Sequence, residues 1–277
     1  MPNLEDPMVR EEMLHGCQVT TVEVASAQAA EALGKAIGSY LTITPALPLD
    51  DPAGVEPAGE CLAEILNRTL QFCRGGTLCI CGIGNPAIQA DALGPEVVCR
   101  LPLQLLSEAG RPGAFRQVCS FSPGTALTNN IRTELLVAGA VRAMGADAAL
   151  LVDSLLTGDP AWLFRTIQVS TAGGLQLHLP GRRADWSVLG VPVISLGVPA
   201  LISLSALAPG LLPRDEMLTG MHIRDIISAA GTILSYAILR VCWPSLSRAE
   251  CFIYSKLHRD PVPYSPVLHR EPAEIHH

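Results

Sequence analysis

Short apolar runs alternate along the chain with longer segments of helical spacing. The runs are rich in Val, Ile and Leu and end at glycine, proline, serine or aspartate, which is typical of strands in a sheet. Strands are predicted over residues 19–24, 40–44, 78–81, 118–121, 148–152, 166–170 and 191–196. Helices are predicted over residues 25–36, 60–73, 93–107 and 221–241, with a further helix that is capped near residues 128–130 and runs to 144.

The order of these elements predicts an α/β fold. Strands and helices follow one another without an internal repeat, which favours one doubly wound, mostly parallel sheet with helices on both faces. The N-terminal strands are compatible with a small antiparallel addition to this sheet. We expect a loose arm over residues 1–18, a single domain over 19–243 and a poorly ordered tail over 244–277.

The composition supports a large buried core and narrows the possible partners. Of the 277 residues, 49% are hydrophobic and only 16% are charged. Aromatic residues make up 4%, so Leu, Val, Ile and Ala must build a core of the kind found in covered sheets. A net charge of −7 argues against a nucleic-acid partner.

Two apolar segments raise the question of a membrane. Residues 187–213 carry no charge but contain four prolines, which favours strands and loops over a spanning helix. Residues 226–241 form a short apolar stretch between charged residues. The first twenty residues are acidic and lack the apolar core of a signal peptide. We therefore expect no membrane partner and a cytoplasmic location.

Nine cysteines are scattered through the chain and form no CxxC pair. Several lie in apolar runs, which favours buried, reduced thiols in a cytosolic protein over a disulfide framework or a zinc site.

The segment from residue 78 to 98 is the first candidate for chemistry. A buried strand is followed by the turn Gly82-Ile83-Gly84-Asn85 and by a helix that starts near Asp91 and Gly94. In an open α/β sheet, sites form at the carboxyl ends of the strands. We expect Gly82, Gly84, Asn85 and Gly94 to shape a loop that presents Asp91.

A second aspartate, Asp153, follows the predicted strand 148–152 directly. If the two strands are neighbours, Asp91 and Asp153 can converge and share one proton. One carboxyl can then act as a base for water and the other as an acid for a leaving group, as in peptide hydrolysis. A plain alternative is that Asp91 caps a helix and Asp153 stabilises a turn.

Other common sites lack their motifs. The glycines do not complete GxGxxG, no Gly-Lys-Ser or Gly-Lys-Thr forms a P-loop, and no GxSxG provides a nucleophile elbow. His178 and His222 have no metal-ligand spacing, so we expect surface or capping roles, no metal and no cofactor.

Several motifs together resemble the germination protease family (spore proteases, GPR endopeptidases). The most specific is GIGN-x5-DALGP at residues 82–95. Further similar segments follow in the family's order: residues 19–43, SPG at 122–124, LLVDSL at 150–155, RTIQVSTAGG at 165–174, LGVPVISLGVP at 189–199 and the last helix. The resemblance covers about residues 19–243.

This resemblance implies an α/β/α fold related to the hydrogenase-maturation proteases. It also implies an aspartyl-type endopeptidase that degrades small acid-soluble spore proteins during germination, in the forespore or spore core. Family members are made as zymogens and assemble as tetramers, so a homo-oligomer is expected. The catalytic aspartates of the family correspond to Asp91 and Asp153.

The family's basic, glycine-rich loop is altered here after Thr171, and its Arg-Thr-Asp-Leu-Ala processing stretch is missing. Two alternatives therefore remain open. One is a metal-assisted maturation-type peptidase in which His178 completes an Asp91–Asp153 site. The other is a non-catalytic relative that binds proteins.

Overall fold

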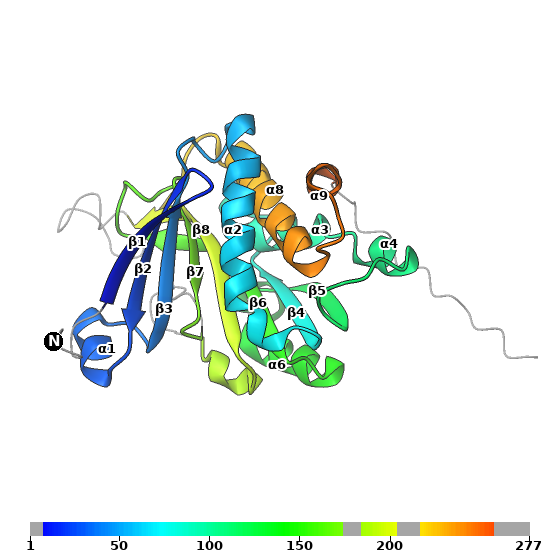
Figure 1. The fold of residues 1–277 in the computed structure, drawn as a ribbon. Helices are drawn as coiled ribbons and strands as arrows, with labels where there is room; N and C mark the ends of the chain where they lie inside the picture. The colour runs from blue at the N-terminus through cyan, green and yellow to red at the C-terminus, as the bar shows by residue number, and fades with distance from the viewer. Residues whose placement is uncertain (1–7, 174–183, 204–216, 258–277) are drawn as a thin grey trace, which may run out of the picture.

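A mixed sheet of nine strands organises the computed structural model, which describes residues 8–173, 184–203 and 217–257 (Figure 1). The order across the sheet is β1-β2-β3-β7-β8-β6-β4-β5, and β9 pairs with β8. The strands are β1 (Met8–Leu14), β2 (Cys17–Val24), β3 (Gly38–Thr44), β4 (Thr77–Ile83), β5 (Gln117–Gly124), β6 (Ala148–Thr157), β7 (Ile167–Ser170), β8 (Val193–Ser203) and β9 (Met217–Leu218).

The sheet has a parallel part and an antiparallel part. Pairs among β8, β6, β4 and β5 are parallel, and the other pairs are antiparallel. The predicted α/β fold with parallel central strands is confirmed. The antiparallel part is larger than expected, because β7 pairs with both β3 and β8 and so attaches three N-terminal strands to the central ones.

The N-terminal arm differs from the prediction. Residues 8–14, which were expected to be loose, form strand β1 and pair with β2 along its whole length. The side chains of β1 are mostly exposed, so no apolar alternation marked this strand in the sequence. Main-chain pairing with β2 holds it at the edge of the sheet.

Helices cover both faces of the sheet and give three layers (Figure 1). One core cluster joins alternate residues of the strands, such as Leu78 and Leu150, to α2, α3 and α8. The other cluster joins Cys79 and Leu151 to α6 and the 3₁₀ turn η4 (Trp186–Leu189). The helices are α1 (Ala27–Leu33), α2 (Val55–Thr69), α3 (Leu93–Cys99), α4 (Leu103–Glu108), α5 (Ala126–Asn129), α6 (Thr133–Met144), α8 (Ile223–Cys242) and α9 (Arg248–Lys256).

Two helical predictions need correction. The helix expected over residues 93–107 is two helices, α3 and α4, because Pro102 cannot continue the hydrogen-bond ladder. The tail expected to be poorly ordered from residue 244 contains α9. Its start is fixed by a capping box in which Ser247 and Glu250 satisfy each other's main-chain N–H groups.

Helix α8 is long and apolar enough to cross a membrane by length and composition. However, 72% of its most apolar window is buried inside the protein. It packs against α2, α3 and α9 in the first core cluster. This burial identifies α8 as a core helix, as the sequence predicted.

All nine cysteines lie in the described part of the chain, and none forms a disulfide. Seven are buried and two are half-buried, which confirms the prediction of buried, free thiols.

Candidate functional site

The site loop begins where β4 and α3 approach each other unusually closely. A Cβ atom on Gly82 would lie 2.1 Å from the carbonyl oxygen of Gly94. A Cβ atom on Gly94 would lie 2.3 Å from Ile83 O and 2.5 Å from Val152 O. Glycine is therefore required at both positions to let the start of α3 rest on β4 and β6.

Gly84 and Asn85 then turn the chain over the end of β4. Gly84 has a φ of +135°, which only glycine adopts readily, and a Cβ there would meet Asp91 O at 1.9 Å. The main-chain N–H of Asn85 donates to Oδ2 of Asp91 over 2.8 Å. The Asn85 side chain accepts from Ala87 N and closes the turn.

Asp91 does not cap α3, contrary to the plain alternative. It ends the 3₁₀ turn η3 (Gln89–Asp91), and the position before α3 is Ala92, which makes no side-chain cap. The carboxyl group faces back toward Asn85 instead. The loop thus holds Asp91 by a contact within the site.

Asp153 lies inside β6 rather than at its end, which corrects the sequence prediction. Pairing with β4 stops at Gly82↔Val152, but β6 continues to Thr157 because β8 runs beside it. Asp153 therefore lies one residue past the end of its pairing with β4, at the level of the loop. It is only 6% exposed.

The charge of Asp91 acts on Asp153. Burial raises the pKa of Asp153 well above its usual range, and the charge of Asp91 raises it further, while the N–H of Ser154 opposes both. Burial also raises the pKa of Asp91, against the hydrogen bond from Asn85. Two such carboxyl groups hold one proton between them more readily than they ionise together.

This arrangement has the chemistry of an acid–base pair. Asp153 is the more deeply buried and retains its proton more strongly, whereas Asp91 receives an N–H donor that favours its ionised form. A protonated and an ionised carboxyl in one site can give one proton and take another in the same reaction.

Three further residues beside Asp153 were not singled out in the sequence. Gly197 on β8 is its register partner, and a Cβ there would lie 2.4 Å from Asp153 O. The hydroxyl groups of Ser154 and Ser195 are buried without a hydrogen-bond partner in the described chain. A serine inside the apolar run of β8 was a signal that sequence reasoning could have used.

Among the described residues, no group of three His, Cys, Asp or Glu side chains has the arrangement of a metal site. His178, the third ligand considered in the metal-assisted alternative, lies outside the described residues. His222 directly precedes α8 and makes no side-chain cap.

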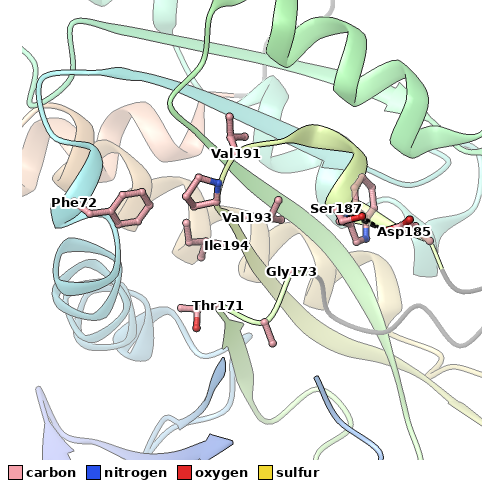
Figure 2. Close-up of a pocket in the computed structure, with 12 residues that line it drawn as sticks. Phe72, Thr171, Gly173, Asp185, Ser187, Val191, Val193 and Ile194 are labelled. Atoms are coloured by element: carbon pink, nitrogen blue, oxygen red, sulfur yellow. Dashed lines mark hydrogen bonds between the residues drawn. The ribbon is translucent and has the colours of Figure 1, made fainter. Parts of the chain in front are cut away.

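A cavity of about 460 Å³ is lined by residues from several elements, and Figure 2 shows the side chains that line it. Its lining includes Phe72, Thr171, Asp185 and Val193, which places it at the amino end of β8. Neither Asp91 nor Asp153 lines it. Because its lining comes from both sides of residues 174–183, which are outside the described chain, we place no chemistry in it.

The chain is similar to known germination proteases. The family model described as germination protease matches residues 2–228. A germination protease of Caldanaerobacter subterraneus subsp. tengcongensis is 31% identical over 72% of this chain and 64% of its own length. A germination protease of Clostridium perfringens is 28% identical over 73% of this chain and 65% of its own length. One from Priestia megaterium is 28% identical over 70% of this chain and 55% of its own length.

This chain thus spans between 55% and 65% of the length of these relatives. Among solved structures, it is similar to the [NiFe] hydrogenase maturation protease HycI from Thermococcus kodakarensis, at 16% identity and a TM-score of 0.33. That match covers 61% of this chain and 98% of HycI, and its TM-score is too low to support any argument. The family match covers most of the chain, including both aspartates and the loop between β4 and α3. The chain therefore belongs to the germination protease family.

Proposed function

We propose that this protein is an aspartyl-type endopeptidase and that Asp91 and Asp153 are its catalytic pair. The observation that carries the proposal is a deeply buried carboxyl group, Asp153 on β6, that feels the charge of Asp91 in the loop after β4. Membership in a family whose relatives are named germination proteases supports the same activity.

In the proposed reaction, the ionised carboxyl of Asp91 takes a proton from a water molecule. The resulting hydroxide forms a bond to the carbonyl carbon of the scissile peptide. Asp153 gives its proton to the substrate, and the C–N bond breaks to release an amine and a carboxylic acid. The water supplies the atoms that are added, so the reaction needs no further reactant.

The proposed substrates are small acid-soluble spore proteins that are cleaved during germination in the spore core. The relatives are named germination proteases, which supports a role during germination. The proposal extends to a cytoplasmic homo-oligomer, with a tetramer expected from the family resemblance. Removal of an N-terminal segment remains a prediction of the same resemblance.

The test is cleavage of a purified small acid-soluble spore protein by the full chain and by two variants. Asp91→Asn and Asp153→Asn should each lower the rate at least about a hundredfold, because each removes one half of the acid–base pair. Asp50→Asn replaces an exposed aspartate outside the site and should retain the parent rate. Circular dichroism of each variant shows whether the fold is kept.

Retained cleavage in either folded site variant would contradict the proposed pair. Binding of the spore protein without cleavage by the parent chain would favour the non-catalytic alternative. Loss of cleavage on chelation, restored by a divalent ion, would favour the metal-assisted alternative.

A further inference from the structure

Three buried polar atoms without hydrogen-bond partners cluster around Asp153. In the described chain, four buried side-chain atoms have no such partner, and the fourth, Arg100 Nε, is at the C-cap of α3. The clustered atoms are Asp153 Oδ1, Ser154 Oγ and Ser195 Oγ. Proteins rarely leave buried polar atoms unpaired, so a cluster of them at one place calls for a functional explanation.

The strand register places the hydroxyl groups of Ser195 and Ser154 on opposite faces of the sheet. Ser195 pairs with Leu151, and Asp153 pairs with Gly197, so Ser195 and Asp153 lie on the same face of adjacent strands as diagonal neighbours. Diagonal neighbours on adjacent strands are roughly 7–8 Å apart, and one water molecule can bridge polar side chains at that separation. Ser154 follows Asp153 directly in the strand and points to the opposite face.

We propose that Ser195 positions the carboxyl group of Asp153, its hydroxyl donating a hydrogen bond to the ionised carboxyl through one water molecule. Ser195 is only 3% exposed, and β8 holds its backbone between β6 and β7. Its hydroxyl group is thus confined to the face that it shares with Asp153. This role deepens the proposed function and rests on it.

The Ser195 hydroxyl group favours the ionised form of Asp153, whereas the other influences favour the protonated form. A hydrogen bond to a charged carboxyl is stronger than one to the neutral acid, so it favours ionisation. Burial and Asp91 act in the other direction. Ser195 therefore keeps Asp153 able to lose and regain its proton. Three of the elements packed against β6 carry titratable side chains, and β8 carries none. They are Asp91 on η3, Glu96 and Cys99 on α3, and Cys79 and Cys81 on β4. Of these, Glu96 forms an ion pair with Arg100.

The test is a carbon-13 NMR titration of the full chain labelled at the aspartate carboxyl carbons. The Asp153 signal is identified by its loss in Asp153→Asn. In Ser195→Ala the titration midpoint of Asp153 should rise by about 0.5–1 pH unit, because a donor to the ionised form is lost. Ser195→Thr retains the hydroxyl and should bring the midpoint back toward that of the parent.

Two controls separate this role from simple packing. Ser235→Ala removes a fully buried hydroxyl on α8, away from the site, and should leave the Asp153 midpoint unchanged. Circular dichroism and thermal unfolding of Ser195→Ala show whether the fold is kept. If Ser195→Ala does not fold, Ser195→Cys gives the same comparison with a much weaker donor.

An unchanged or lowered midpoint in folded Ser195→Ala would overturn the proposal. An equal rise in Ser154→Ala would also overturn it, since the effect would then come from repacking around β6. The titration does not depend on proteolysis. A parent chain that fails to cleave spore protein therefore contradicts the proposed function, while the midpoint still decides the role of Ser195.

Discussion

Asp153 is a carboxyl group in surroundings that oppose its ionisation. Its side chain is buried and close enough to Asp91 to be affected by that charge. The folded state therefore holds the Asp153 proton more tightly than the unfolded chain does, where an aspartate has a pKa of about 3.9. Stability from this group is fully present below pH 4 and is lost as pH rises toward the pKa of the folded state.

We predict that Asp153→Asn becomes more stable relative to the parent as pH rises. Near pH 4 the parent loses little stability from ionisation of Asp153. The two proteins then differ in stability mainly through the packing of the amide. Above pH 4 the difference should grow by up to about 1.4 kcal/mol per pH unit, until the folded parent also loses its proton. Urea denaturation at pH 4, 5.5 and 7 measures this.

The exposed Asp50→Asn variant serves as the control and should follow the parent at each pH. A stability difference for Asp153→Asn that stays constant over this range would contradict the prediction.

Sequence reasoning could find the two aspartates but not their surroundings. Apolar runs before Asp91 and Asp153 located both near strand ends, and the structure brings the two close enough to interact. The neighbours of Asp153 on β8 depend on which strand lies beside β6 and in what register. Neither is encoded by local patterns. The serine inside the apolar run of β8 could be noticed in the sequence, but the position of Ser195 and Gly197 beside Asp153 could be recognised only in the folded chain.

The contact between β4 and α3 is the element-scale basis of the site. Gly82 and Gly94 face each other with no space for a side chain, and Gly94 also touches the strand that carries Asp153. The helix, the two strands and the loop that carries Asp91 therefore share one closely packed point. A side chain there would push α3 outward and move the loop with it.

We predict that Gly94→Ala destabilises the protein by about 1–3 kcal/mol, because its methyl group overlaps main-chain atoms of Ile83 and Val152. The matched control is Gly139→Ala in α6, where a methyl group would meet no atom within 4 Å. That exposed helix position should instead gain about 0.5–1 kcal/mol from helix propensity. Thermal unfolding of both variants checks the two signs, and a neutral Gly94→Ala would refute the close contact.

Cores of elements were predictable, whereas several of their ends were not. The apolar runs of β6 and β8 identified both strands, but mutual pairing extends them well past those runs. Helix α9 carried a readable signal, the Ser247 and Glu250 spacing of a capping box. The residues around α9 are mostly polar, so the segment was assigned to a poorly ordered tail and the capping box was not used.

At the scale of the whole molecule, Arg100 links three helices through hydrogen bonds. From the C-cap of α3, its guanidinium donates to Ser228 and Thr232 on α8 and to the carbonyl of Ser255 on α9. It also pairs with Glu96, and the Arg100 side chain is only 5% exposed. Burial makes these contacts costly to break, since the loss of the guanidinium removes the donor for several buried oxygen atoms.

We predict that Arg100→Met lowers the free energy of unfolding by about 3 kcal/mol or more. Arg68→Met breaks a pair of the same i,i+4 spacing, but the Arg68 side chain is 51% exposed. That control should cost less than about 1 kcal/mol. Urea denaturation compares the two, and equal losses would show that burial does not set the strength of the Arg100 pair.

The order of strands has a consequence for the time course of folding. The three N-terminal strands join the central ones only through β7, where Ile43 pairs with Ile167. During synthesis, the edge of β3 that pairs with β7 has no partner until β7 has left the ribosome. Helix α2 follows soon after and covers one face of these strands, but it cannot close that edge. Such distant pairing is slow to form, so docking of β7 against β3 is expected to be a late step in folding.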